Sequence, residues 1–160
     1  MELAEFEALA KPLLRRSVTE QAAYGFALVD GHSVTAQEIM SVEREMAVSL
    51  PDKYKAFMIR FGGGAFGFVE LFPLAPVASG SDDLRTLNDR DFADRNFVAI
   101  APVGTGDHWG FPVTNGRCDD SVWFRFHDAG DDEPAAADFL EFVAEHGLKS
   151  SADRALERRD

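Results

Sequence analysis

Apolar residues recur every three or four positions in five stretches of the chain, and this spacing places them on one face of a helix. The predicted helices span residues 3–16, 36–48, 52–61, 82–93 and 134–147. Thr35 and Glu38 have the spacing of a capping box before the second helix. Asp52 is placed to cap the third, and Pro134 is placed to open the last. The tail, residues 149–160, is polar, and we expect it to fray.

Segments rich in aromatic and β-branched residues, which favour strands, follow the third predicted helix. They span residues 66–72, 97–101, 108–113 and 121–126. Asn115 and Gly116 separate the last two, and a two-residue hairpin needs the positive φ that Asn and Gly tolerate. Strands joined in this way run antiparallel. The order of elements therefore predicts an α+β fold, a single domain with a mostly antiparallel sheet and helices packed on one face. Residues 17–34 fit either a short strand or a packed loop.

Charge narrows the classes of partner. The chain has 160 residues, enough for one domain, and 16 Lys and Arg against 28 Asp and Glu give a net charge of −12. Residues 82–160 hold 18 of the acids and nine of the bases, a net charge of −9. This field repels phosphate backbones and anionic membranes, so we expect no nucleic-acid or membrane partner. It favours a basic protein partner, although net charge also serves solubility alone.

Other features point to a cytoplasmic protein. No apolar run approaches the ~20 residues that span a bilayer, and the N-terminus lacks the basic and apolar stretches of a signal peptide. The single cysteine, Cys118, cannot form an internal disulfide, which suits a reducing compartment. We expect Asp119 and Asp120 to raise the pKa of the Cys118 thiol and make it a poor nucleophile.

Two patterns suggest chemistry. Residues 62–67 match G-x-G-x-x-G, but a dinucleotide site needs a strand before the glycines and a helix after them. Here the predicted order is reversed, so we interpret the glycines as a helix end that leads into a strand, with no cofactor. Asp107-His108 and His127-Asp128 lie on predicted antiparallel neighbours. If they converge, they could hold a divalent metal or act as acid and base; structural hydrogen bonds are the alternative.

The chain resembles the SUKH superfamily, a family of bacterial immunity proteins that also contains the yeast cell-wall assembly regulators. The resemblance covers about residues 35–146, which we take as the core of a single SUKH-like domain over residues 1–160. Its first block comprises Glu43, Leu50-Pro51, Tyr54, Phe57, Gly63-Gly64 and residues 66–74. Its second block comprises residues 97–103, Gly106-Asp107, residues 122–127 and residues 138–143. The family often has Asn before the glycine doublet, where this chain has Gly62.

This resemblance implies a non-enzymatic intracellular binding protein with no catalytic residues and no cofactor. Many members look like immunity proteins that neutralise a polymorphic toxin, often a nuclease or a deaminase. A nuclease must be basic to hold its substrate, so the acidic charge suits such a partner. We expect a basic toxin domain to bind a surface of acids and an aromatic anchor: Asp107, Trp109, Asp119, Asp120, Asp128, Asp131 and Asp132. A place in the core is the alternative for Trp109.

Two other functions stay open from the sequence. One is a regulatory or scaffold interaction module in a host pathway, as in the yeast relatives. The other is a small metal-dependent hydrolase that uses Asp107, His108 and His127.

Overall fold

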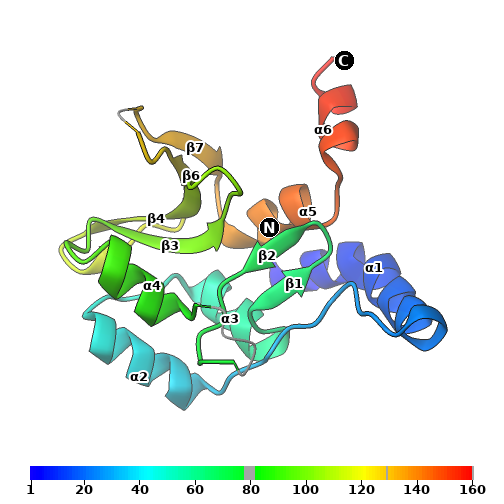
Figure 1. The fold of residues 1–160 in the computed structure, drawn as a ribbon, viewed down its shortest axis with the longest axis horizontal. Coiled ribbons are helices and arrows are strands. Elements are labelled where there is room, and N and C mark those ends of the chain that lie inside the picture. The colour runs from blue at the N-terminus through cyan, green and yellow to red at the C-terminus, as the bar shows by residue number, and fades with distance from the viewer. Residues whose placement is uncertain (78–81, 129, 160) are drawn as a thin grey trace.

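The computed structural model describes residues 1–77, 82–128 and 130–159. Helices begin and end the chain and flank the strands (Figure 1). Their bounds are α1 Leu3–Tyr24, α2 Ala36–Met46, α3 Asp52–Arg60, α4 Leu84–Asp91, α5 Phe139–Gly147 and α6 Ser151–Glu157. The strands are β1 Gly64–Phe66, β2 Val69–Leu71, β3 Phe97–Pro102, β4 His108–Thr114, β5 Arg117–Cys118, β6 Val122–Arg125 and β7 Glu133–Ala136.

The strands form two antiparallel sheets, which confirms the predicted α+β fold. β1 and β2 make a hairpin. The larger sheet has the order β3-β4-β6-β7, and β5 pairs with the end of β4. Asn115 and Gly116, at φ 51° and 75°, form the predicted tight turn, although it leads from β4 into the short β5 and not directly into β6. In Figure 1 the larger sheet lies apart from α1, with α3 and α5 between them and α4 alongside β3.

Aromatic side chains join the helices to the sheets in one core. Phe6 of α1 contacts Phe57 of α3 and Phe66 of β1, with ring centroids 5.7 Å apart in both pairs. Tyr54 lies edge-on to Phe139 of α5 at 4.9 Å. All five of these side chains are fully buried. Because aromatic burial dominates core energetics, this cluster fixes how the helices sit against the sheet.

Three predicted boundaries were wrong, and the structure shows a reason for each. α1 continues through residues 17–24, because none of these residues is a glycine or a proline, and Gly25 ends it at φ 77°. Residues 66–72 form the β1–β2 hairpin rather than one strand, because Gly67 turns the chain at φ 60°. Pro134 lies in β7 opposite Trp123, where an edge strand tolerates its missing N–H.

The last predicted helix therefore starts later. α5 begins after Asp138, whose Oδ1 accepts the Glu141 N–H at 2.9 Å. The polar tail contains α6, which has no buried residue. It begins at a capping box formed by Ser150 and Asp153.

The glycine run serves close backbone packing. A Cβ on Gly62 would lie 2.1 Å from the carbonyl carbon of His32, and one on Gly63 would lie 2.5 Å from the carbonyl oxygen of Phe72. The run follows α3 and enters β1, which is the reverse of the order that a dinucleotide-binding turn requires. The structural interpretation of G-x-G-x-x-G is confirmed.

Candidate functional site: the acidic end of the larger sheet

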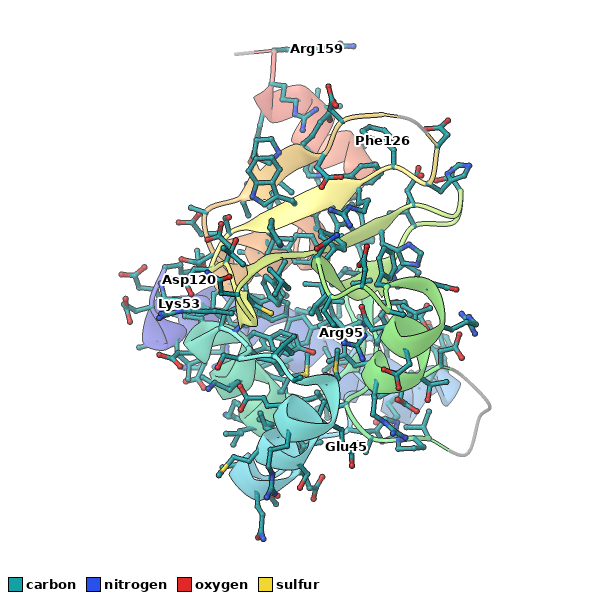
Figure 2. All side chains as sticks on the ribbon, turned by 90° about the vertical axis from the view of Figure 1, so that its left-hand side faces the viewer. Glu45, Lys53, Arg95, Asp120, Phe126 and Arg159 are labelled. Atoms are coloured by element: carbon teal, nitrogen blue, oxygen red, sulfur yellow. The ribbon has the colours of Figure 1, made fainter. Side chains whose placement is uncertain are left out.

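The acids predicted to bind a partner lie at two ends of the larger sheet. Asp107 precedes β4, and the loop from Asp128 to Asp132 follows β6, so antiparallel pairing of β4 and β6 brings them to one end. Asp119 and Asp120 lie at the other end, where the Asp119 N–H donates to the Pro112 carbonyl. At about 3.3 Å per residue, Asp107 and Pro112 are about 17 Å apart along β4. Figure 2 shows Asp120 and Phe126 at opposite ends of β6.

Asp107 holds its end of the sheet together. Its Oδ1 accepts the backbone N–H of His127 at 2.7 Å and lies 2.6 Å from the Nδ1 of that imidazole. Its Oδ2 accepts the Thr105 hydroxyl at 2.8 Å. These hydrogen bonds, first of all the one from the His127 backbone, lower the pKa of Asp107 to about 2. The same carboxylate raises the pKa of His127, whose side chain remains 57% exposed.

Asp132 is also bound within the chain. The Arg125 guanidinium donates to both of its carboxylate oxygens, with Nη2 2.8 Å from Oδ2. The same guanidinium lies over the Phe97 ring, 4.2 Å from its centroid. Asp128 and Asp131 differ, because both are exposed, and their carboxylates make no hydrogen bond or ion pair within the part of the chain that the structure describes. They are therefore free to meet a partner.

A cleft of about 310 Å³ opens beside this loop. The end of α4, the turn before β4 and the end of β6 line it, through Asp91, Phe92, Gly106, His108, Arg125, Phe126 and His127. Phe92 lies edge-on to the His108 ring at 5.4 Å, and Phe126 lies edge-on to Phe124 at 4.8 Å. Burial lowers the pKa of His108 and so favours its neutral imidazole.

The sequence reasoning missed Phe92, Arg125 and Phe126 as candidate functional residues. Phe92 is in the apolar pattern of a helix, and Phe126 ends an aromatic strand. Both therefore look like ordinary core positions. One feature of the sequence could have identified Phe126 as a candidate: it directly precedes His127 and Asp128, where the predicted strand leads into the acidic loop.

Trp109 belongs to a different neighbourhood. It is half-buried on β4, with its ring centroid 4.9 Å from His146 and 5.3 Å from Phe142, both on α5. Phe124 of β6 packs against it edge-on at 5.8 Å. Most of its contacts thus join the sheet to α5, which is the core role that the sequence left as the alternative.

The sequence raised the possibility that Asp107-His108 and His127-Asp128 converge, and the structure brings together one Asp and one His from these two pairs. Asp107 and His127 meet, and His108 lines the same cleft. Over residues 1–77, 82–128 and 130–159, no group of three or more His, Cys, Asp or Glu side chains could hold a metal ion. Cys118 is buried, and burial first and then Glu43 raise the pKa of its thiol to about 12. The expected direction is right, but the Cys118 pKa is raised by burial and by Glu43 instead of by Asp119 and Asp120.

The motif residues of both resemblance blocks have structural roles. The Glu43 carboxylate accepts the Leu50 N–H at 2.8 Å and so shapes the link between α2 and α3. Asp138 caps α5 and also binds the Lys53 Nζ at 2.9 Å and the N-terminal ammonium at 2.7 Å. Tyr54 packs on Phe139. These residues therefore specify the fold.

Comparison with known proteins gives the family to which the chain belongs. None of the curated proteins matches the chain. No helix among the described residues is both long enough and apolar enough to cross a bilayer. The profile of SUKH_6, described as SMI1-KNR4 cell-wall, matches residues 36–143, from the start of α2 into α5. The chain is therefore a member of the SUKH_6 family within the SUKH superfamily.

Proposed function

We propose that this protein is a non-enzymatic cytoplasmic immunity protein that neutralises a basic toxin domain, such as a nuclease or a deaminase, by binding it at the acidic end of the larger sheet. The observation that carries the proposal is the pair Asp128 and Asp131, which are exposed and unpaired within the described chain beside a cleft of a SUKH fold. An inhibitor of this kind covers a site and needs no chemistry of its own.

The frame around these two acids supports that role. Asp107 ties the turn before β4 to His127, and Arg125 ties Asp132 to β6. Both ends of the loop are thus held by charge-assisted hydrogen bonds, which are stronger than neutral ones. Glu133, exposed at the start of β7, adds a third outward carboxylate. A cluster of fixed negative charge steers a basic partner during diffusion and raises the association rate.

The test compares the two ends of the sheet. Asp128→Asn with Asp131→Asn removes two charges beside the cleft, while Asp119→Asn with Asp120→Asn removes two exposed charges from the opposite end. Both double variants have the same net charge, so they serve as matched controls for each other. Association with a purified candidate toxin domain is measured by stopped-flow fluorescence at about 20 mM and about 300 mM salt, because the Debye length shrinks with ionic strength.

We expect the Asp128/Asp131 variant to associate about three- to tenfold more slowly at low salt and to lose most of its salt dependence. The Asp119/Asp120 variant should retain a rate within about twofold of the parent. Wild-type protein should abolish the activity of the toxin at one molar equivalent. Equal slowing of association by both variants would exclude the acidic end as the contact surface. Failure to inhibit any basic toxin encoded beside its gene would exclude the immunity role.

The family description favours a second candidate, a regulatory or scaffold module of the SMI1-KNR4 type. Affinity capture from the native host distinguishes the two functions. A single basic partner at one-to-one stoichiometry that loses its activity in the complex supports immunity. A set of envelope-synthesis or signalling proteins that remain active in the complex supports the scaffold.

A further inference from the structure

The cleft beside the acidic loop combines aromatic walls with carboxylates. Phe92, His108 and Phe126 line it, and Asp91 lies at its edge. Asp91 lines the same cleft as His108, and Asp107 directly precedes His108 in the chain. Aromatic faces attract cations, and the attraction grows when the cation leaves water. A cleft with this lining suits a cationic side chain better than an apolar one.

The chain already seats one guanidinium in this way. Arg125 lies 4.2 Å from the Phe97 ring centroid while Asp132 accepts from its Nε and Nη2. An aromatic ring and a carboxylate together therefore hold a guanidinium that lines the cleft. Phe92 is 5.6 Å from Phe97 and continues the same aromatic group into the cleft.

The charged groups around the cleft have a net negative charge, which one more cation would reduce. Arg125 is neutralised by Asp132, and Arg90 by Asp91 and Asp82. His127 faces Asp107, and Asp128 stands next to His127 with no cation bound to it among the described residues. Carboxylates thus outnumber guanidiniums at this edge. A phosphate or another anion would meet this excess of negative charge.

We propose that the cleft binds an arginine or lysine side chain that the basic partner inserts between Phe92 and Phe126, with its charge near Asp91 and Asp128. This inference rests on the proposed function, since it names the group by which that partner is anchored. Electrostatic steering by the exposed acids would bring the partner in, and the cleft would then hold it. The exposed acids would therefore set the association rate, and the cleft residues would set the dissociation rate.

The first test needs no partner. Nα-acetyl-arginine amide, Nα-acetyl-lysine amide and the neutral isostere Nα-acetyl-citrulline amide are each titrated into the labelled protein. The side-chain resonances of Phe92, His108 and Phe126 are followed by NMR. We expect the arginine or the lysine probe to shift these three rings in a saturable manner, and citrulline to bind at least about fivefold more weakly. Inorganic phosphate is titrated in parallel.

Two variants isolate the aromatic contribution. Phe126→Leu retains apolar bulk but removes the ring face, and Phe68→Leu makes the same change in the β1–β2 turn, where Phe68 is 65% exposed. Phe126→Leu should weaken the cationic probe at least about threefold, while Phe68→Leu should leave its affinity unchanged. Unaltered thermal melting of both variants establishes that the fold is retained. If Phe126→Leu unfolds the protein, Asp91→Asn replaces it, with the same expected direction.

Several results would overturn the inference. They are citrulline that binds as tightly as the cationic probes, phosphate that binds at the three rings more tightly than those probes do, and cationic-probe shifts that map outside the cleft. In the toxin complex, Phe126→Leu should raise the dissociation rate at least about tenfold with little change in association. If only Asp128→Asn with Asp131→Asn alters the kinetics, the proposed function stands and the cleft is not the anchor.

Discussion

Asn88 is the residue whose replacement should damage the fold most for its size. It is fully buried on α4. Its side chain makes hydrogen bonds to the backbone of β3 at the edge of that strand that faces away from β4. Its Oδ1 accepts the Ala99 N–H at 2.8 Å, and its Nδ2 donates to the Ala99 carbonyl at 2.9 Å and to the Leu84 carbonyl at 2.8 Å. The amide thus pairs with β3 as a neighbouring strand would, and it positions Asp91 and Phe92 at the cleft.

Asn88→Ala leaves the N–H and the carbonyl of Ala99 buried without a partner. Ala99 is itself fully buried, so each group loses its hydrogen bond at a cost of about 1–3 kcal/mol. We expect the free energy of unfolding to fall by about 3–5 kcal/mol for the two groups together. In a chain of this length, 1 kcal/mol corresponds to about 2–4 °C in melting temperature, so the melting temperature should fall by about 10 °C.

Urea unfolding, followed through the fluorescence of Trp109 and Trp123 and through far-ultraviolet circular dichroism, measures this loss. Arg85→Ala on the same helix is the control, because Arg85 is 46% exposed and its ion pair with Glu45, at 3.1 Å, lies at the surface. It should cost less than about 1 kcal/mol. Asn88→Asp retains the acceptor but cannot donate to the Ala99 carbonyl, so its loss should also be large.

Equal stability of the Asn88→Ala and Arg85→Ala variants would refute this reasoning. It would mean that water, or a shift of α4, satisfies the edge of β3 without the amide.

Two further predictions concern titration. The pKa of His127, measured by NMR, should lie above 6.5 in the parent and fall towards it in Asp107→Asn, because the Asp107 carboxylate, with a smaller effect from Asp128, favours the imidazolium. A raised folded-state pKa stabilises the protein below the unfolded value and loses this effect as pH rises through the folded value, so the parent should lose more stability between pH 6 and pH 9 than Asp107→Asn; an unchanged His127 pKa in the variant would contradict the pairing. Cys118 should react with a disulfide reagent at pH 8 at least about thirtyfold more slowly in the folded protein than in urea, since burial raises its pKa to about 12 and the loss of thiolate outweighs the greater nucleophilicity of each thiolate; rapid labelling of the folded chain would contradict its burial.

Local chemistry made much of the fold readable from the sequence. The capping pair Thr35 and Glu38 gives α2, where the Thr35 hydroxyl accepts the Glu38 N–H at 3.1 Å. The Asn115-Gly116 turn follows from the positive φ that only a few residues adopt without strain. A capped helix end or a tight turn depends on residues no more than four positions apart, so the order of residue types along the chain is enough to predict it. The same reasoning fails at Pro134, whose favourable position at a helix start is overridden by pairing with β6.

The candidate site depended on longer-range facts. Antiparallel order of β4 and β6 predicts that Asp107 meets His127, and the structure confirms this contact at 2.6 Å. The sequence could not separate Asp128 from Asp120, eight residues apart, because their difference lies in which end of the sheet each loop occupies. Nor could it show that Asp132 is held by Arg125 while Asp131 faces solvent.

The sequence by itself determined most of the helices and strands, the acidic charge and the family blocks, because periodicity, capping and turn chemistry act over a few residues. It did not predict β5, β7 or α6. Only the tertiary structure decided which acids share a surface and which aromatic residues line the cleft, such as Phe92 beside Phe126. The physical reason is that strand pairing and core packing join residues far apart in the chain, and the energy that selects one arrangement is distributed over the whole aromatic core.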